Sequence, residues 1–420
     1  MPGPKLNSRP PASRDQYPLS RRSFLGGAVL AGLAGGLPAL GQASRDEAPG
    51  TPRPCPPSAW EKHGLFMEPT EGWESGRFQN FTSPAEPIDN GQWRIWYSAG
   101  ISSPKSFTLA YAEAGPDGGG IKKVPMQRST GRAPDTPFGL GNLPDGWNPT
   151  QVVHIRMRNG RHRIYFWAHG PEILRYLAAD SEDGRRYRVL DPLRPVLYHP
   201  NDRAARGVPS PDGVLLSKRP ASRPSDEPPA PAHLISNDAT NVYQLADGTF
   251  EMYSVALFPV PKSDPAYIAH DNAPGLLRFV DRYTSEDGLR FETRQRVIQR
   301  DERDPTDQQF YYLSVTHTPK GRVGMLGHYR VEAQTMDLEW CFSRDGLTWD
   351  RRNRTAWLPR GDRSQPDSYG IYAPSYLVHR DGRYHLFYTA VNSAHNGKDS
   401  HGPPRSVIMY ASADSIWSGA

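Results

Sequence analysis

The chain has 420 residues, with 50 Lys and Arg against 45 Asp and Glu, 43 Pro, 39 Gly and 10% aromatic residues. So many prolines and glycines disfavour a helical protein and are typical of short strands joined by turns. The sequence has no internal run of about eighteen apolar residues that would span a bilayer, and no basic stripe with interleaved aromatic residues that would indicate a nucleic-acid partner.

The first residues have the features of a cleavable export signal. The pair Arg21-Arg22 is followed by Ser-Phe-Leu, an apolar Gly- and Ala-rich stretch over residues 26–40, and small residues near Ala43. This pattern resembles a bacterial twin-arginine signal, with a general secretory signal as the alternative. The resemblance implies the twin-arginine export machinery as a partner, a periplasmic or secreted location, and no stable membrane anchor after cleavage.

The expected signal also explains the excess of positive charge. Residues 1–43 hold five of the 50 Lys and Arg and one of the 45 Asp and Glu, which leaves 45 and 44 in the remainder. We therefore expect a nearly neutral mature protein, with an N-terminal tail over residues 44–64 and one domain over residues 65–420.

A polar turn followed by a strand-forming segment recurs five times in that domain. Asn-Gly and Asp-Gly supply the positive φ angles of a tight hairpin, and the aromatic and β-branched residues behind them suit a sheet. The turns are Asn90-Gly91, Asn159-Gly160, Asp247-Gly248, Lys320-Gly321 and Asp381-Gly382, and the strands behind them are expected over residues 93–97, 163–167, 250–254, 323–327 and 384–388.

A second motif, Ser-x-Asp-Gly, follows an apolar strand at residues 181–184, 285–288 and 343–346. Each unit thus reads as four antiparallel strands. One twisted sheet cannot bury both of its faces, whereas sheets arranged radially cover one another. The sequence predicts an all-β fold, a five-bladed β-propeller of four-stranded antiparallel blades. A sandwich or a six-bladed propeller is less favoured, because only five units are present.

Two segments interrupt the repeat. Residues 119–148 are polar and rich in Gly and Pro, and residues 199–233 carry eight prolines and many charges. We expect both to be long surface loops that contribute nothing to a core. Loops of this length on a propeller often line a binding site.

The repeat resembles the five-bladed propeller glycosidases, such as glycoside hydrolase families 32, 43 and 117. The resemblance implies a glycoside hydrolase that acts on an oligo- or polysaccharide at the central mouth, and it leaves the sugar and linkage open. A non-catalytic carbohydrate-binding propeller is the alternative, and a lyase or phosphorylase is a third possibility. The matching elements are Ser-x-Asp-Gly-x-x-Phe/Trp, residues 374–378 leading to 381–384, and residues 238–243.

In those relatives the first strand of each blade lines the channel, and acids ahead of it converge on one opening. One carboxylic acid then protonates the leaving oxygen, and a second carboxylate activates water or attacks the sugar. An Asp that caps a turn is the structural alternative. The acids in this position are Glu74, Asp145, Asp238, Asp307 and Asp367, of which Asp238 is the expected general or pKa-setting acid, and Glu74 or Asp307 the expected base or nucleophile.

Aromatic and polar residues near the same openings are the expected sugar contacts, because rings stack on sugars and amides bind hydroxyls. For the aromatic residues, packing between blades is the alternative. The expected substrate-binding residues are Asp145, Trp147, Tyr311, Asp367, Tyr369, Arg77 and His395.

The sequence predicts neither a cofactor nor a metal, because no cysteine–histidine cluster has the spacing of a zinc site. His154 lies in an alternating strand and is interpreted as a core histidine. Cys55 and Cys341 either form a disulfide or remain two separate thiols, and the sequence leaves both open.

Overall fold

The computed structural model describes residues 59–417, apart from 80–82, 101–106, 117, 172, 199–201, 203, 207–214, 217–233, 292 and 353. The chain divides into two compact parts after Thr51, and all the described residues belong to the part that begins at Pro52. The expected export signal, Cys55 and most of the second proline-rich segment lie outside the described residues.

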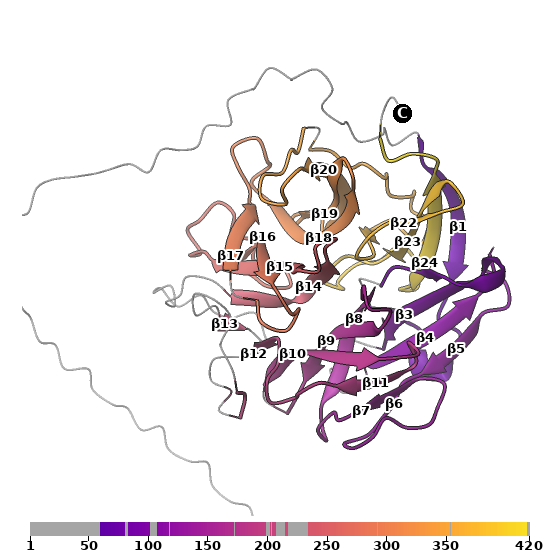
Figure 1. Ribbon diagram of the computed structural model, residues 1–420. Helices are drawn as coiled ribbons and strands as arrows, with labels where there is room; N and C mark the ends of the chain where they lie inside the picture. The colour runs from indigo at the N-terminus through magenta and orange to yellow at the C-terminus, as the bar shows by residue number, and fades with distance from the viewer. Residues whose placement is uncertain are drawn as a thin grey trace, which may run out of the picture. The chain divides into compact units, whose positions relative to one another are not determined.

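The described part of the chain is all-β (Figure 1). Its helical segments are two single 3₁₀ turns, η2 (Gly72–Glu74) and η3 (Asp89–Gly91). Within these residues no helix has the length and apolar character needed to cross a bilayer. The all-β prediction is confirmed.

The first two units form separate sheets. The first is antiparallel, in the order β2-β3-β4-β5, and the second runs β6-β7-β11-β10-β9-β8 with β12 beside β10. Their strands are β2 (Glu86–Pro87), β3 (Trp93–Ala99), β4 (Thr108–Ala114), β5 (Lys122–Pro125), β6 (Gln127–Arg128), β7 (Gly139–Gly141), β8 (Asn148–Arg156), β9 (His162–His169), β10 (Leu174–Ser181), β11 (Arg186–Val189) and β12 (Leu197–Tyr198).

The third unit is a sheet in the order β13-β14-β15-β16-β17, and the last two units share one sheet, β1-β24-β23-β21-β20-β19-β18, with β22 beside β23. Their strands are β13 (Leu215–Leu216), β14 (Leu234–Gln244), β15 (Phe250–Pro259), β16 (Leu276–Ser285), β17 (Thr293–Ile298), β18 (Gln308–Thr318), β19 (Gly321–Arg330), β20 (Thr335–Ser343), β21 (Gly370–Tyr372), β22 (Val378–Arg380), β23 (Arg383–Val391), β24 (Ser406–Ala413) and β1 (Glu61–Met67).

Hydrogen bonds link each unit to the next, as expected for a propeller. The last unit also contacts the first, through Ser406 Oγ and the Phe78 carbonyl oxygen at 2.8 Å. The number of blades stays a prediction, because backbone pairing merges the last two units into one sheet. The other links are Ser83 to Val152, Tyr176 to Thr240, Asn241 to Leu313, and Val315 to Ser375.

The Ser-x-Asp-Gly motif is a strand-terminating turn. β10, β16 and β20 each end at the serine of the motif. In the first copy Ser181 Oγ accepts the Gly184 N–H at 3.0 Å, and Asp183 Oδ1 accepts the N–H groups of Arg185 and Arg186 at 2.9 Å each. The aspartate therefore satisfies backbone donors at the turn and is not available for chemistry.

The first interrupting segment contradicts the expectation of a coreless loop. Residues 119–148 include β5, β6 and β7, and the aromatic ring of Phe138 is fully buried. Leu140 and Leu143 pack in the same cluster as Phe138, against Trp96 of β3 and Phe166 of β9. The few apolar residues of this segment thus fill the space between the first two sheets.

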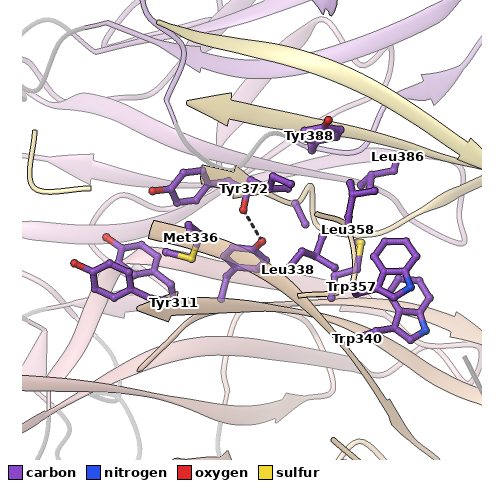
Figure 2. Packing of buried hydrophobic residues seen from close by; sticks show 14 of the residues in the cluster. Tyr311, Met336, Leu338, Trp340, Trp357, Leu358, Tyr372, Leu386 and Tyr388 are labelled. Atoms are coloured by element: carbon purple, nitrogen blue, oxygen red, sulfur yellow. Dashed lines mark hydrogen bonds between the residues drawn. The ribbon is translucent and has the colours of Figure 1, made fainter. Parts of the chain in front are cut away.

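The largest apolar cluster lies between the third, fourth and fifth units (Figure 2). In it Trp340 and Trp357 stack with ring centroids 4.2 Å apart. Tyr312 of β18 donates to the Ile371 carbonyl oxygen of β21 at 3.0 Å. This cluster fixes the positions of Tyr311 and Tyr372, two aromatic residues that reach the candidate site.

Candidate functional site

A buried arginine organises polar groups at the end of the propeller where the first strands begin. Arg278, near the start of β16, is only 1% exposed. It donates to Asp271 Oδ2 at 3.1 Å, to Gln309 Oε1 at 2.7 Å and to Asn272 Oδ1 at 2.6 Å. Its guanidinium group is therefore compensated by one carboxylate and two amide oxygens, as a buried charge requires.

The partner carboxylate, Asp271, is held ionised. Burial on its own would raise its pKa, but the charge of Arg278 and a hydrogen bond from the Tyr329 hydroxyl, at 2.6 Å, together hold the pKa below its usual value. The rings of Tyr311 and Tyr329 lie 5.0 and 5.4 Å from the Arg278 guanidinium carbon, within cation–π range.

His395 completes the network from the loop after β23. Its Nε2 lies 2.9 Å from Asn272 Nδ2, and its Nδ1 lies 2.7 Å from the Tyr372 hydroxyl. Since Asn272 turns its oxygen to Arg278, its Nδ2 donates to His395 Nε2, and His395 Nδ1–H donates to Tyr372. Burial, and next the charge of Arg278, lower the pKa of His395 to about 3, so the imidazole is neutral at pH 7.

We name this set the Arg278 network: Asp271, Asn272, Arg278, Gln309, Tyr311, Tyr329, Tyr372 and His395. Of the sequence-predicted residues, it contains Tyr311 and His395, whose rings lie 4.6 Å apart. The charge of Arg77 also reaches His395 and lowers its pKa. The sequence did not single out Asp271 and Asn272, because they belong to the irregular segment between β15 and β16, outside the repeat. It did not single out Arg278 either, which lies just after that segment, near the start of β16.

Glu74 does not belong to this network. It ends the η2 turn and is fully buried. Its carboxylate receives Lys123 Nζ at 2.9 Å, the Tyr97 hydroxyl at 2.7 Å, and the N–H groups of Thr70 and Glu71 at 2.7 and 2.8 Å. These four donors satisfy the carboxylate within the first unit, which is the arrangement of a structural acid.

Asp307 and Asp367 are also engaged with cations. Asp307 receives Arg330 Nη2 at 2.7 Å and Nε at 3.0 Å, and it is 9% exposed. Asp367 is 1% exposed and receives Lys62 Nζ at 2.7 Å and the Tyr388 hydroxyl at 3.1 Å. The Arg330 side chain is 38% exposed, so of these pairs the one at Asp307 can open toward solvent most readily.

The remaining predicted residues take different positions. Asp145 is exposed, and Trp147 packs on Arg175, with 4.5 Å from the guanidinium carbon to the ring centroid. Tyr369 is half-buried, and its hydroxyl donates to Asp399. Asp238 lies inside β14, where the pairing with β15 shifts between Ile235 and Thr240, and its side chain is outside the described residues. Convergence of the five acids on one opening stays a prediction.

A large cavity opens at the opposite end of the first strands, where the hairpin turns lie. Its volume is about 1090 Å³, and it is lined by the last residues of β8, β14 and β18 with their turns. Arg156, Lys320 and Arg344 give it positive charge, and Tyr243 and Tyr384 supply aromatic surface. From the sequence we expected ligand contacts at the other end only.

Among known proteins, neither a family model nor a curated sequence matches the chain. An N-acetylgalactosamine deacetylase from F. plautii, solved with blood group B trisaccharide, has 14% identity and a TM-score of 0.51, covering 86% of this chain and 95% of its own. A glycoside hydrolase also matches, with 15% identity and a TM-score of 0.49, covering 84% of this chain and 91% of its own. A thermostable family-43 glycoside hydrolase matches with 11% identity and a TM-score of 0.49, covering 80% of this chain and 89% of its own. The first of these likenesses shows that the chain has the same fold, an all-β propeller.

Proposed function

We propose that the protein is an exported glycoside hydrolase that binds a carbohydrate at the Arg278 network. The observation that carries the proposal is the network itself. It brings an amide, a neutral imidazole and phenol groups to one place beside aromatic rings, and this mixture suits sugar hydroxyls and apolar sugar faces. The F. plautii protein, which shares the fold, was solved with a trisaccharide, in keeping with a sugar ligand here.

Hydrolysis needs two carboxyl groups with different protonation states. We assign the general acid to Asp238 and the base or nucleophile to Asp307, whose partner Arg330 is exposed enough to move. Glu74 is dropped from the proposed pair, because freeing it would break bonds with four donors at once. Asp271, tied to Arg278, positions the network and does not take part in proton transfer.

The test is a screen of the full chain against aryl glycosides and plant or bacterial polysaccharides, followed by Asp238→Asn and Asp307→Asn. Each variant should lose about a hundredfold to ten-thousandfold in turnover. Asp247→Asn is the control, because Asp247 is in a hairpin turn at the opposite end and its carboxylate bonds with Thr249. Full activity in both site variants would rule out these catalytic assignments.

A carbohydrate-binding propeller without catalysis is the second candidate, favoured by the ion pairing of the acids. Glu74, Asp307 and Asp367 are all bonded to Lys or Arg side chains, which leaves no pair of uncompensated acids among them. Under this alternative a sugar binds in calorimetry with no product formed, and His395→Ala weakens binding. Release of sugar product by the wild-type chain would exclude it.

We also propose export through the twin-arginine pathway to the periplasm or the outside, on the strength of the Arg21-Arg22 pattern. Replacing both arginines with Lys should leave folded precursor in the cytoplasm. Cell fractionation followed by immunoblotting measures this directly. Normal export of the double variant would point to the general secretory route.

A further inference from the structure

Three potential metal ligands meet between the first and second units. His154 of β8 lies opposite Ile164, and His162 of β9 lies opposite Arg156, so the two histidines are diagonal neighbours on one face of the hairpin. Glu86 of β2 reaches them because the preceding Ser83 bonds to the backbone of β8. The three side chains thus come from two consecutive units of the repeat.

We propose that Glu86, His154 and His162 form a binding site for a divalent transition-metal ion of the zinc class. One nitrogen of each histidine and one oxygen of Glu86 lie within 4.8 Å of one another. His154 Nε2 and His162 Nδ1 are 2.9 Å apart. Ligand atoms around a tetrahedral ion with bonds of about 2.0–2.2 Å lie roughly 3.3 Å apart, so small rotations produce the coordination geometry.

The burial, ring packing and protonation state of the two histidines suit metal ligands. They are 2% and 6% exposed, and the ring of His154 stacks on Trp96 at 3.5 Å with an interplanar angle of 11°. Burial is the largest cause that lowers the pKa of both imidazoles, which keeps them neutral, the form that binds metal. When the metal binds, the proton in the hydrogen bond between the two rings moves to the other nitrogen of the ring that carries it. The two histidines together therefore lose no proton.

The carboxylate has an oxygen available. Glu86 Oε2 is buried and accepts no hydrogen bond from the described residues. Its nearest cations are Arg94, at 3.8 Å from Oε2, and Arg156, at 3.6 Å from Oε1. A carboxylate oxygen beside two neutral imidazoles completes a three-ligand set that suits zinc.

The positive charges of Arg94 and Arg156 oppose metal binding, and this leads to a specific prediction. Both compete with the metal for Glu86 and repel it. The Arg156 side chain is 66% exposed, so it can withdraw into the neighbouring cavity that it lines. Removing the charge of Arg156 should therefore strengthen metal binding, a result that a purely structural histidine pair would not give.

The experiment uses the full chain, without a polyhistidine tag, after treatment with a chelator. Titration with Zn²⁺ in a calorimeter should show one ion per chain, and Co²⁺ should develop visible absorption. His154→Gln, His162→Gln and Glu86→Gln should each weaken binding about a hundredfold or more. Arg156→Gln should bind several-fold more tightly. His328→Gln is the matched control, because His328 is a buried histidine of β19 whose pKa burial also lowers.

Failure of the wild-type chain to bind Zn²⁺ or Co²⁺ would overturn the proposal, as would unchanged affinity in folded His154→Gln and His162→Gln. If those two variants do not fold, Arg156→Gln and Glu86→Gln decide the matter. Weaker binding in the former, or undiminished binding in the latter, would contradict the site. None of these results depends on glycosidase activity.

Discussion

At the scale of single residues, buried charge in this protein is compensated by specific partners. Arg278 illustrates this, because one side chain bonds to three others and lies over two tyrosine rings. A network of this kind holds its members in fixed positions, which is what a binding site needs. It also makes the site sensitive to loss of its central residue.

Arg278→Gln should lower the free energy of unfolding by about 3–5 kcal/mol, because it leaves Asp271 buried without its cation. Urea denaturation measures this. Arg405→Gln is the matched control. It removes an ion pair to Glu68 whose partners are 48% and 47% exposed, and it should cost at most about 1 kcal/mol. Equal losses in the two variants would show that Arg278 has no central role.

Residue roles were predictable only where a repeated motif shows them. The aspartates of Ser-x-Asp-Gly recur at the same place after a strand, and all three accept backbone N–H groups that close the turn. Asp271 occurs once, in an irregular segment, and its partner Tyr329 is 58 residues away. Local pattern carries no information on such a contact, since only the complete fold brings the two residues together.

At the scale of elements, strands and hairpin turns followed from the sequence. Asn90 and Gly91 have φ of 60° and 77°, and Asp381 and Gly382 have φ of 52° and 77°, as these two pairs predicted. At Asn159-Gly160 and Asp247-Gly248 only the glycine has a positive φ. β1 was not foreseen, because it pairs with β24 at the other end of the chain. Its sequence, Glu61–Met67, has no turn of the repeated type before it.

Phe66→Ala tests the contribution of β1 to the fold. Phe66 is 5% exposed and packs on Phe387 of β23, with ring centroids 4.7 Å apart. Its removal should cost about 3–5 kcal/mol, seen as a lower midpoint in urea. Leu65→Ala, next to it in β1 but 49% exposed, should change stability by less than about 0.5 kcal/mol. Equal effects would mean that β1 is not packed as described.

A second element-scale prediction concerns the contact between the third and fourth units. Glu251 of β15 is fully buried and bonds to Arg282 of β16, His317 of β18 and Arg322 of β19. Burial opposes ionisation, but these partners outweigh it and lower the pKa of Glu251 from 4.5 to about 2. Its stabilising effect is therefore complete above the unfolded-state pKa and is lost as the pH falls toward 2.

This shift corresponds to about 3 kcal/mol of stability between pH 5 and pH 2. Glu251→Gln should remove that part of the acid sensitivity. The free energies of unfolding of variant and wild type should therefore approach each other as the pH falls. Denaturation in urea at intervals from pH 7 to pH 3 measures the difference. Glu182→Gln, with a side chain 77% exposed, is the control and should follow the wild-type curve.

At the scale of the whole molecule, the fold depends on a contact between the two ends of the described chain. β1 supplies the last strand of the sheet that contains β24, and Ser406 bonds to Phe78 of the first unit. The propeller class was predictable from the repeat, since the turns of each unit can be recognised in its sequence. The closing contact was not, because β1, one of its two strands, lies outside the repeated motif.

Closure leads to the last prediction, which compares two truncations. Removing residues 1–43 leaves β1 intact and should preserve a single cooperative thermal transition in the circular dichroism of the β-sheet band. Removing residues 1–67 deletes β1 and uncovers Phe387 and Ile408, which pack with Phe66 in the cluster between the last and first units. Because each sheet of a propeller is covered by its neighbours, an open ring exposes apolar surface at both free faces. The shorter chain should therefore melt at a lower temperature over a broader range, or aggregate. A sharp transition at the original temperature would show that the ring is held closed without β1.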